Sequence, residues 1–412
     1  MIVTSAVRHT AAGAAAILLV LPGPAASAAS LSSASSVDEP TPPARYVVDP
    51  GRLDRSGTQV QPLRGAAEPP SVSALSWVVA DATTGEVLAA RNAHKPLPPA
   101  STLKALFALT ALPHQDAGDR HTVSDEELTG IGEGSSLVGV KEGYTYKVSD
   151  LWNGVFLSSG NDAVHVLAAM NGGWESMTRQ MQEKARSLGA RDTHVVSPDG
   201  YDAPGQVSSA YDLAVFGRAG LQDPQFTRYC STRYADFPAG SWSYGIVNTN
   251  RLLTGANGVE RYPGLLGIKN GYTSNAGNTL ISAARRGPRT LVVSVMNPQW
   301  GGGLAVYEEA RELLDWGFEA AGRVQPVGSL KPLEDLQKKS RKAAQAGPKA
   351  PAARPVAVHA AAEAPAGSSK RDVSRGATPS GTTAGLPLAL VGAALGAALS
   401  LWLWRRFGAR GN

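Results

Sequence analysis

Ser101 and Lys104 are the first residues whose types and spacing suggest chemistry, within the segment PPASTLKALFAL. Pro98 and Pro99 end an extended segment, because proline is tolerated before or at a helix start but not inside the helix. Ser101 is therefore expected in the first helical turn, where free backbone N–H groups favour developing negative charge. Lys104 lies three residues later on the same face, where it can serve as the base that a serine nucleophile needs.

The same spacing also fits an ordinary helix start followed by an exposed lysine, so further motifs must decide. Ser159 and Asn161 offer a hydroxyl and an amide between two helical stretches, in the segment LSSGNDA. Lys269 places a cation on an apolar strand, GIKNGYT, and Gly271 two positions later permits close backbone approach. Each segment alone also fits a simple turn, but the three together indicate one catalytic pocket.

These segments resemble the motifs S-x-x-K, S-x-N and K-T-G of the penicillin-binding protein and serine β-lactamase superfamily. The closer resemblance is to D-alanyl-D-alanine carboxypeptidases of the peptidase S11 type, and it covers roughly residues 75–320. It rests on the segments VVADATTGEVLAARNAHKPLPPASTLK, LVGVKEGYTYKVSDLWNGVFLSSGNDAV, VVSPDGYDAPGQVSSAYDLAVFGR and GIKNGYTSNAGNTLISAARRG. The resemblance implies a serine D-Ala-D-Ala carboxypeptidase that removes the terminal D-alanine from peptidoglycan stem peptides and is acylated by β-lactams.

The resemblance also implies a role for each polar residue of the first two motifs. Ser101 would attack the carbonyl between the two D-alanines and form the acyl-ester, and Lys104 would accept its proton. Ser159 would relay that proton to the leaving amine, and Asn161 would hold the amide backbone of the substrate. Water would then hydrolyse the acyl-enzyme.

The third motif supplies the substrate-binding residues that the resemblance implies. Lys269 would attract the terminal carboxylate of the substrate, and the backbone N–H groups of Ser101 and Thr273 would hold the oxyanion. Asn270 departs from the family pattern, which usually has Thr or Ser at this position. Its amide can still donate to a carboxylate, so we expect Lys269, Asn270, Gly271 and Thr273 all to contribute to substrate binding.

Two alternatives to a carboxypeptidase remain open. A DD-endopeptidase or a β-lactamase of the same fold would use the same residues, although no carboxylate suited to activating water in a β-lactamase can be assigned. A catalytically decayed protein that binds the cell wall would not need them. The intact Ser101, Lys104, Ser159, Asn161 and Lys269 argue against this second alternative.

No metal, cofactor or nucleic acid is expected. Cys230 is the only cysteine, there is no H-E-x-x-H motif, and the histidines lack ligand spacing. The net charge of the chain is +5, but residues 71–324 hold 21 Lys and Arg against 25 Asp and Glu. Residues 325–384 hold 10 against 4, so the basic charge belongs to a tail and not to a face of the folded part.

Apolar and low-complexity runs divide the chain into six segments. Residues 1–28 combine Arg8, an apolar run and an A-x-A pattern, which predicts a secretory signal peptide. Residues 385–404 carry no charge and precede several arginines, which predicts a transmembrane helix of about 30 Å. We further expect a disordered Ser/Pro/Ala-rich segment at 29–70, the catalytic domain at 71–324, a disordered Ala/Pro/Lys-rich linker at 325–384 and a cytoplasmic basic tail at 405–412. The protein would thus be a single-pass protein of the cell membrane with an extracytoplasmic catalytic domain.

Strand patterns lie at both ends of the predicted domain and helical patterns in its middle. ALSWVVADATTG and EVLAARN indicate a strand pair, helix starts recur between Ser101 and about Tyr229, and GLLGIKNGYT, NTLISAARRG and RTLVVSVMN indicate later strands. Short connections favour one antiparallel sheet built from the N- and C-terminal strands, with a mostly helical insert. This α/β (α+β) arrangement agrees with the penicillin-binding transpeptidase-like fold that the resemblance implies.

Overall fold

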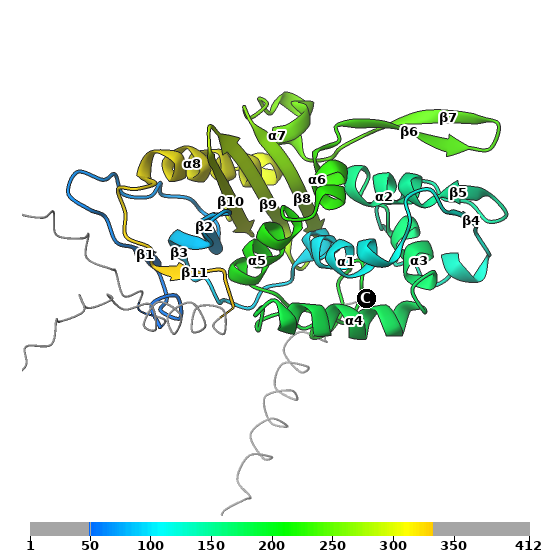
Figure 1. Cartoon of the computed structure of the whole chain (residues 1–412), viewed down its shortest axis with the longest axis horizontal. Helices are drawn as coiled ribbons and strands as arrows, with labels where there is room; N and C mark the ends of the chain where they lie inside the picture. The colour runs from blue at the N-terminus through cyan, green and yellow to red at the C-terminus, as the bar shows by residue number, and fades with distance from the viewer. Residues whose placement is uncertain (1–48, 50, 333–412) are drawn as a thin grey trace, which may run out of the picture. The chain divides into compact units, whose positions relative to one another are not determined.

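Strands from the two ends of the described chain pair in one antiparallel sheet of seven strands, in the order β1-β3-β2-β10-β9-β8, with β11 paired to β3. The computed structural model describes residue 49 and residues 51–332 (Figure 1). The β2–β10 pairing, with Val79 opposite Val293, joins the early strands to the late ones and confirms the predicted sheet. The strands are β1 (Thr58–Val60), β2 (Ser76–Asp81), β3 (Glu86–Arg91), β8 (Leu265–Thr273), β9 (Gly277–Arg286), β10 (Arg289–Met296) and β11 (Gly328–Ser329).

Helices cover both faces of this sheet. Helix α8 (Ala305–Ala320) packs on one face of β9 and β10, and α5 (Ala210–Gly220) packs on the other (Figure 1). Side chains alternate along β2, so Val78 joins the core under α5 while Val79 joins the core under α8. Because both faces are buried, the central strands are almost continuously apolar.

The segment between β3 and β8 forms the mostly helical insert that the sequence predicts. A two-stranded hairpin within it, β6 and β7, projects beyond the helices in Figure 1 and was not foreseen. The insert contains α1 (Lys104–Ala111), α2 (Val148–Leu157), α3 (Asn161–Ala169), α4 (Trp174–Ser187), α5, α6 (Pro224–Ser231), α7 (Arg251–Thr254) and the short pairs β4 (Arg120–Thr122) with β5 (Thr145–Lys147) and β6 (Tyr234–Ala239) with β7 (Trp242–Val247).

The predicted domain boundaries of 71–324 need a correction at both ends. Part of the segment 29–70, expected to be disordered, contributes β1 to the sheet and the buried side chain of Leu53. Beyond residue 324, β11 pairs with β3 and Val327 is buried. These segments are too short to show a strand period, and pairing with the longer strand β3 holds them.

The remaining predicted segments lie outside the described residues. They are the signal peptide at 1–28, most of the linker up to 384, the transmembrane helix at 385–404 and the basic tail at 405–412. Within residue 49 and residues 51–332, no helix is both long enough and apolar enough to span a membrane.

Candidate active site

The structure brings Ser101 and Lys104 together in the first turn of the insert. The 3-10 turn η1 (Ala100–Leu103) runs directly into α1, so the two residues are one helical turn apart. Lys104 Nζ donates a hydrogen bond to Ser101 Oγ over 2.9 Å. Ala100, just before the serine, has a φ of +50°, a strained backbone conformation that persists only where the surroundings enforce it.

The ammonium group of Lys104 is buried and held by two further acceptors. It donates to Asn161 Oδ1 over 2.6 Å and to the backbone oxygen of Asp199 over 2.7 Å. Burial lowers the pKa of Lys104 to about 8, against the opposing charges of Asp199 and Asp162. An amine with this pKa is neutral in an appreciable fraction of molecules near neutral pH, so it can accept the Ser101 proton.

Asn161, at the start of α3, is committed to contacts within the protein. Its Oδ1 accepts from Lys104, while its Nδ2 donates to Asp199 Oδ2 over 2.7 Å and to Ser135 Oγ over 3.0 Å. Both N–H donors of the amide are therefore used. This arrangement makes Asn161 an anchor for Lys104, and its predicted contact with the substrate backbone stays a prediction.

Ser159 lies in the turn between α2 and α3 with a φ of +58°. Its Oγ is buried and has no hydrogen-bond partner within residues 51–332. Leaving such a hydroxyl unsatisfied costs about 1–3 kcal/mol, which a bound group could recover. The proton relay through Ser159 stays a prediction, and its free hydroxyl is the feature on which that prediction depends.

Strand β8 passes closest to the nucleophile at Gly271. A Cβ added there would lie 2.7 Å from Ser101 N and 2.7 Å from Thr279 Oγ1. Only glycine therefore allows the strand to lie against the Ser101 amide. Thr279, on the neighbouring strand β9, donates to the backbone oxygen of Pro99 over 2.9 Å, which ties the segment before the nucleophile to the sheet.

The pairing of β8 with β9 determines which backbone amides face the free edge of β8. Arg285 N donates to Gly264 O, so alternate residues of β9 counted from Arg285 direct their backbone groups towards β8. Gly277 is one of these, and its partner Thr273 therefore belongs to the hydrogen-bonded ladder. The amide of Tyr272 points to the free edge instead. The register therefore leaves the amide of Tyr272, and not that of Thr273, at the free edge, and an oxyanion role for either residue stays a prediction.

Lys269 is enclosed in the pocket wall. Its side chain is 1% exposed, and Nζ donates to the backbone oxygen of Asn270 over 2.8 Å. Burial and the nearby charge of Lys104 lower the pKa of Lys269 well below its ordinary value. Two like charges in one buried site repel each other, which favours a neutral amine in the pair. Lys269 is therefore not presented to solvent, and its predicted attraction of a substrate carboxylate stays a prediction.

Asn270 borders a pocket of about 640 Å³ that also contains a cation, Arg251 at the start of α7. Thr249 Oγ1 donates to Asn270 Oδ1 over 3.0 Å, which leaves the Nδ2 donors of Asn270 free for a ligand. The Arg251 guanidinium lies 5.6 Å from the centroid of the Tyr307 ring. Tyr272 also lines the pocket, which therefore adjoins the free edge of β8. A single arginine at the start of a short helix carries no motif, so Arg251 could not be selected from the sequence.

Asp199 is a second residue that sequence reasoning missed. Its Oδ1 accepts from Ser197 Oγ and from Tyr201 N, its Oδ2 accepts from Asn161, and its backbone oxygen accepts from Lys104. The turn sequence SPDG around it lies inside a segment of the family resemblance, which was the available signal. Among the described residues, no three His, Cys, Asp or Glu side chains are grouped as metal ligands would be.

Comparison with known proteins identifies the family that carries this site. The peptidase S11 family, described as D-alanyl-D-alanine carboxypeptidase, matches residues 64–299. The chain belongs to this family. It is 40% identical over 277 residues to D-alanyl-D-alanine carboxypeptidase DacB2 of Mycobacterium tuberculosis, which covers 66% of this chain and 90% of that relative. It is 36% identical over 285 residues to D-alanyl-D-alanine carboxypeptidase DacD of Escherichia coli, and this alignment covers 66% of this chain and 69% of that relative.

Solved structures of family members share the fold. The crystal structure of a D-alanyl-D-alanine carboxypeptidase from Mycobacterium tuberculosis aligns with a TM-score of 0.60 at 39% identity, over 66% of this chain and all of that one. Penicillin binding protein 6B from Escherichia coli aligns with a TM-score of 0.56 at 35% identity, over 63% and 82%. The protein is thus a serine-type D-Ala-D-Ala carboxypeptidase with the fold of penicillin-binding DD-peptidases.

Proposed function

We propose that this S11 carboxypeptidase removes the terminal D-alanine from peptidoglycan stem peptides through an acyl-enzyme on Ser101. The observation that carries the proposal is the 2.9 Å hydrogen bond from the buried Lys104 Nζ to Ser101 Oγ. Neutral Lys104 takes the hydroxyl proton while Oγ attacks the carbonyl between the two D-alanines. The C–N bond then breaks, the proton reaches the leaving amine through Ser159, and water later hydrolyses the ester.

The oxyanion of the tetrahedral intermediate would be held by two backbone amides. The Ser101 N–H lies at the start of the helix, and the Tyr272 N–H points to the free edge of β8. The contact of Gly271 with Ser101 N brings these two donors close to each other. Donors fixed in this way stabilise the charge that develops in the transition state.

The terminal carboxylate of the substrate would enter the pocket of Asn270 and Arg251. The free Nδ2 donors of Asn270 compensate for the missing Thr or Ser of the third motif, and the Arg251 guanidinium supplies the charge. A β-lactam carries a carboxylate and an acyl group in a similar arrangement, so it would acylate the same serine.

We also place the catalytic domain outside the cell, with residues 385–404 as a membrane anchor and the C-terminus in the cytoplasm. This placement is supported by the charge-free run at 385–404, the arginines that follow it and the signal-like segment at 1–28. Protease treatment of intact spheroplasts tests it, because the catalytic domain should be digested while residues 405–412 stay protected.

A labelled penicillin and a peptide ending in D-Ala-D-Ala test the catalytic proposal directly. Wild-type protein should carry the label on Ser101 and release D-alanine, and Ser101→Ala should do neither. Label without D-alanine release would favour a decayed enzyme, and rapid loss of the label with penicillin turnover would favour a β-lactamase. Absence of both label and release from wild-type protein would contradict the proposal.

A further inference from the structure

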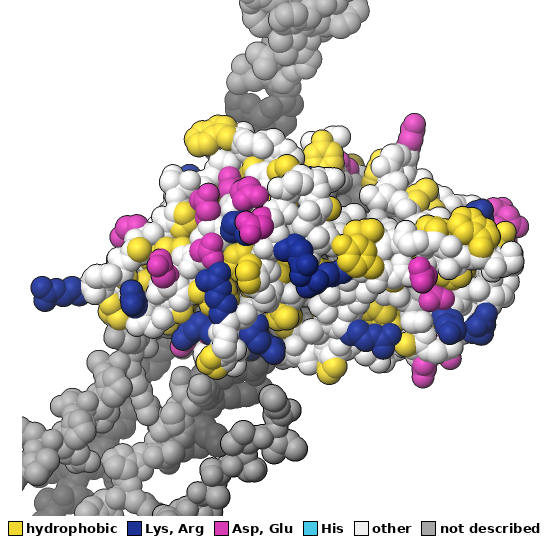
Figure 2. Space-filling view, turned by 90° about the horizontal axis from the view of Figure 1, so that it is seen from above, with side chains coloured by type: hydrophobic (Ala, Val, Ile, Leu, Met, Phe, Trp, Pro, Cys, Tyr) yellow, Lys and Arg dark blue, Asp and Glu magenta, His cyan; other side chains and the backbone are white. Residues whose placement is uncertain are grey.

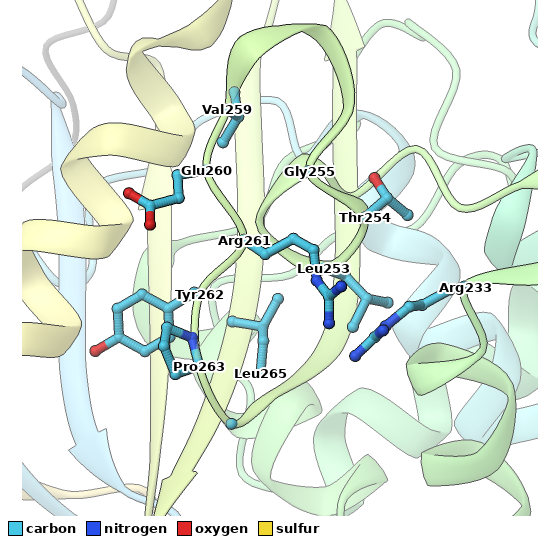
Figure 3. A pocket seen from close by; sticks show the side chains of 11 residues that line it. Arg233, Leu253, Thr254, Gly255, Val259, Glu260, Arg261, Tyr262, Pro263 and Leu265 are labelled. Atoms are coloured by element: carbon cyan, nitrogen blue, oxygen red, sulfur yellow. The ribbon is translucent and has the colours of Figure 1, made fainter.

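A second pocket lies at the other end of β8 from the nucleophile. It has a volume of about 670 Å³ and opens where β8 begins, around Leu265. Gly271, which lies against Ser101, is six positions after Leu265, so the pocket is roughly 20 Å from the nucleophile along the strand. Its walls come from the end of α7 and from the segment leading into β8 (Figure 3).

Two arginines line this pocket, which we call the arginine pocket. Figure 3 shows the side chains of Arg233 and Arg261 reaching towards the same opening from different segments. Neither guanidinium forms an ion pair within the described residues, whereas Arg286 pairs with Asp315 and Arg311 with Glu308. Glu260 is the acidic residue in the lining, and in Figure 3 its carboxylate points towards α8. The pocket therefore keeps an uncompensated positive charge.

The position of Arg261 is fixed by the residues around it. Its stem packs on Gly255, where an added Cβ would lie 2.9 Å from Arg261 Cγ. On one side, the backbone oxygen of Glu260 accepts a hydrogen bond from Arg311. On the other, Tyr262 N donates to Leu252 O over 2.8 Å. The backbone and the stem of Arg261 are thus held in place, while the residue stays exposed to a ligand.

The walls around the two guanidinium groups mix polar and apolar residues. Leu253, Val259, Tyr262, Pro263 and Leu265 supply the apolar part. Guanidinium forks match the paired oxygens of carboxylates and phosphates, and apolar walls accommodate the carbon atoms that bear such a group. Figure 2 looks down on the side of the molecule that carries α7, and basic side chains gather near the middle of that face.

We propose that the arginine pocket is a binding site, separate from the active site, for a carboxylate or phosphate group carried by an organic chain. A ligand group held there would tether a polymer about 20 Å from Ser101 without touching the reacting dipeptide. Removal of both arginines should therefore weaken anion binding while hydrolysis of a short peptide stays unchanged.

Isothermal titration calorimetry of the full-length protein tests the site, with inorganic phosphate and acetate as two separate titrants. The double variant Arg233→Gln/Arg261→Gln should bind at least about tenfold more weakly than wild type, since each lost charge-assisted contact contributes more than one hydrogen bond between neutral groups. The double variant Arg179→Gln/Arg186→Gln on α4 removes the same charge elsewhere and should bind as wild type does. Circular dichroism checks that both variants are folded.

The two probes distinguish the sources of the ligand group. Saturable binding of phosphate alone assigns a phosphodiester chain, and saturable binding of acetate assigns a carboxylate such as those of wall peptides. An equal response of the two double variants, or no saturation by either anion, overturns the proposal. Loss of D-Ala-D-Ala peptide hydrolysis in Arg233→Gln/Arg261→Gln alone would show that the pocket is not separate from the active site. If the wild-type protein does not hydrolyse the peptide, the proposed function is contradicted. The calorimetric test of anion binding at the arginine pocket can still be interpreted in that case.

Discussion

Lys104 has a low pKa because it is completely buried, so pH is the variable that tests its role. Only the neutral amine can accept the Ser101 proton, and protonation disables it as a base. The nearby charge of Asp199 raises the pKa of Lys104 and partly offsets the effect of burial. The chemistry of the serine is therefore set by how one amine is enclosed.

We expect kcat/KM for a D-Ala-D-Ala peptide to rise with pH and to level off above about 8. Below that pH the rate should fall roughly tenfold per unit, because the neutral fraction of Lys104 falls in that proportion. Lys104→Arg should abolish acylation at every pH, since arginine keeps its proton. A flat profile between pH 6 and 9, measured by D-alanine release, would contradict this role.

Asp199→Asn should move the acidic limb of that profile to lower pH. The substitution removes a negative charge that raises the pKa of Lys104, so the amine loses its proton more easily. The plateau should fall as well, because Asn161 loses the carboxylate that accepts from its Nδ2. Asp116→Asn, at an exposed position, is the matched control and should leave both limb and plateau unchanged.

Arg251→Gln should impair binding of substrates that end in a free carboxylate. We expect KM for a peptide ending in D-Ala-D-Ala to rise about tenfold with little change in kcat, because one charge-assisted contact is lost. For the same peptide with an amidated C-terminus, wild type and variant should behave alike. A similar loss for both peptides, in steady-state assays, would assign Arg251 a structural role instead.

At the scale of elements, the contact between β8 and the nucleophile turn leaves no room for a side chain at Gly271. Gly271→Ala would place a methyl group 2.7 Å from Ser101 N, so either the strand or the turn must move. We expect the rate of acylation by penicillin to fall about 10²-fold or more, as when an oxyanion donor is lost. Gly245→Ala on β7 adds a methyl group into open space and should acylate normally.

The helices and strands that the sequence predicted are those whose capping residue or apolar pattern lies within the element itself. Ser209 caps α5, with its side chain accepting from Asp212 N, and β2 and β10 are recognised by their apolar runs. The β6–β7 hairpin was missed because its two strands pair only with each other and expose residues such as Trp242. A hairpin of this kind has no continuous apolar face to signal it.

The residues of the site also divide into those that local sequence reveals and those that only the fold reveals. Ser101, Lys104, Ser159, Asn161 and Lys269 lie in motifs and could be selected from the sequence. Tyr272 could not, because the assignment of its amide depends on the register of β8 against β9. Arg251 and Asp199 contribute through neighbours that only the fold brings close to them.

For the whole molecule, β3 is paired by segments from both ends of the described chain. β1 precedes the predicted domain start, and β11 follows the predicted end at residue 324. We expect a protein ending at residue 324 to unfold in urea with a lower free energy than one ending at residue 332. The reason is that Val327 and Leu330 are buried, and each such side chain contributes about 1.5–3 kcal/mol. Equal stability of the two proteins would contradict the corrected boundary.

The hydrogen bond from Thr279 to Pro99 joins residues 180 positions apart. A chain emerging from the ribosome presents its serine long before it presents the strands that complete the site. Contacts of such high order form late in folding, because a large loop must close first. A nascent or truncated chain that stops before β9 should therefore not be acylated at Ser101. The serine would become reactive only after the C-terminal strands have been synthesised and have paired.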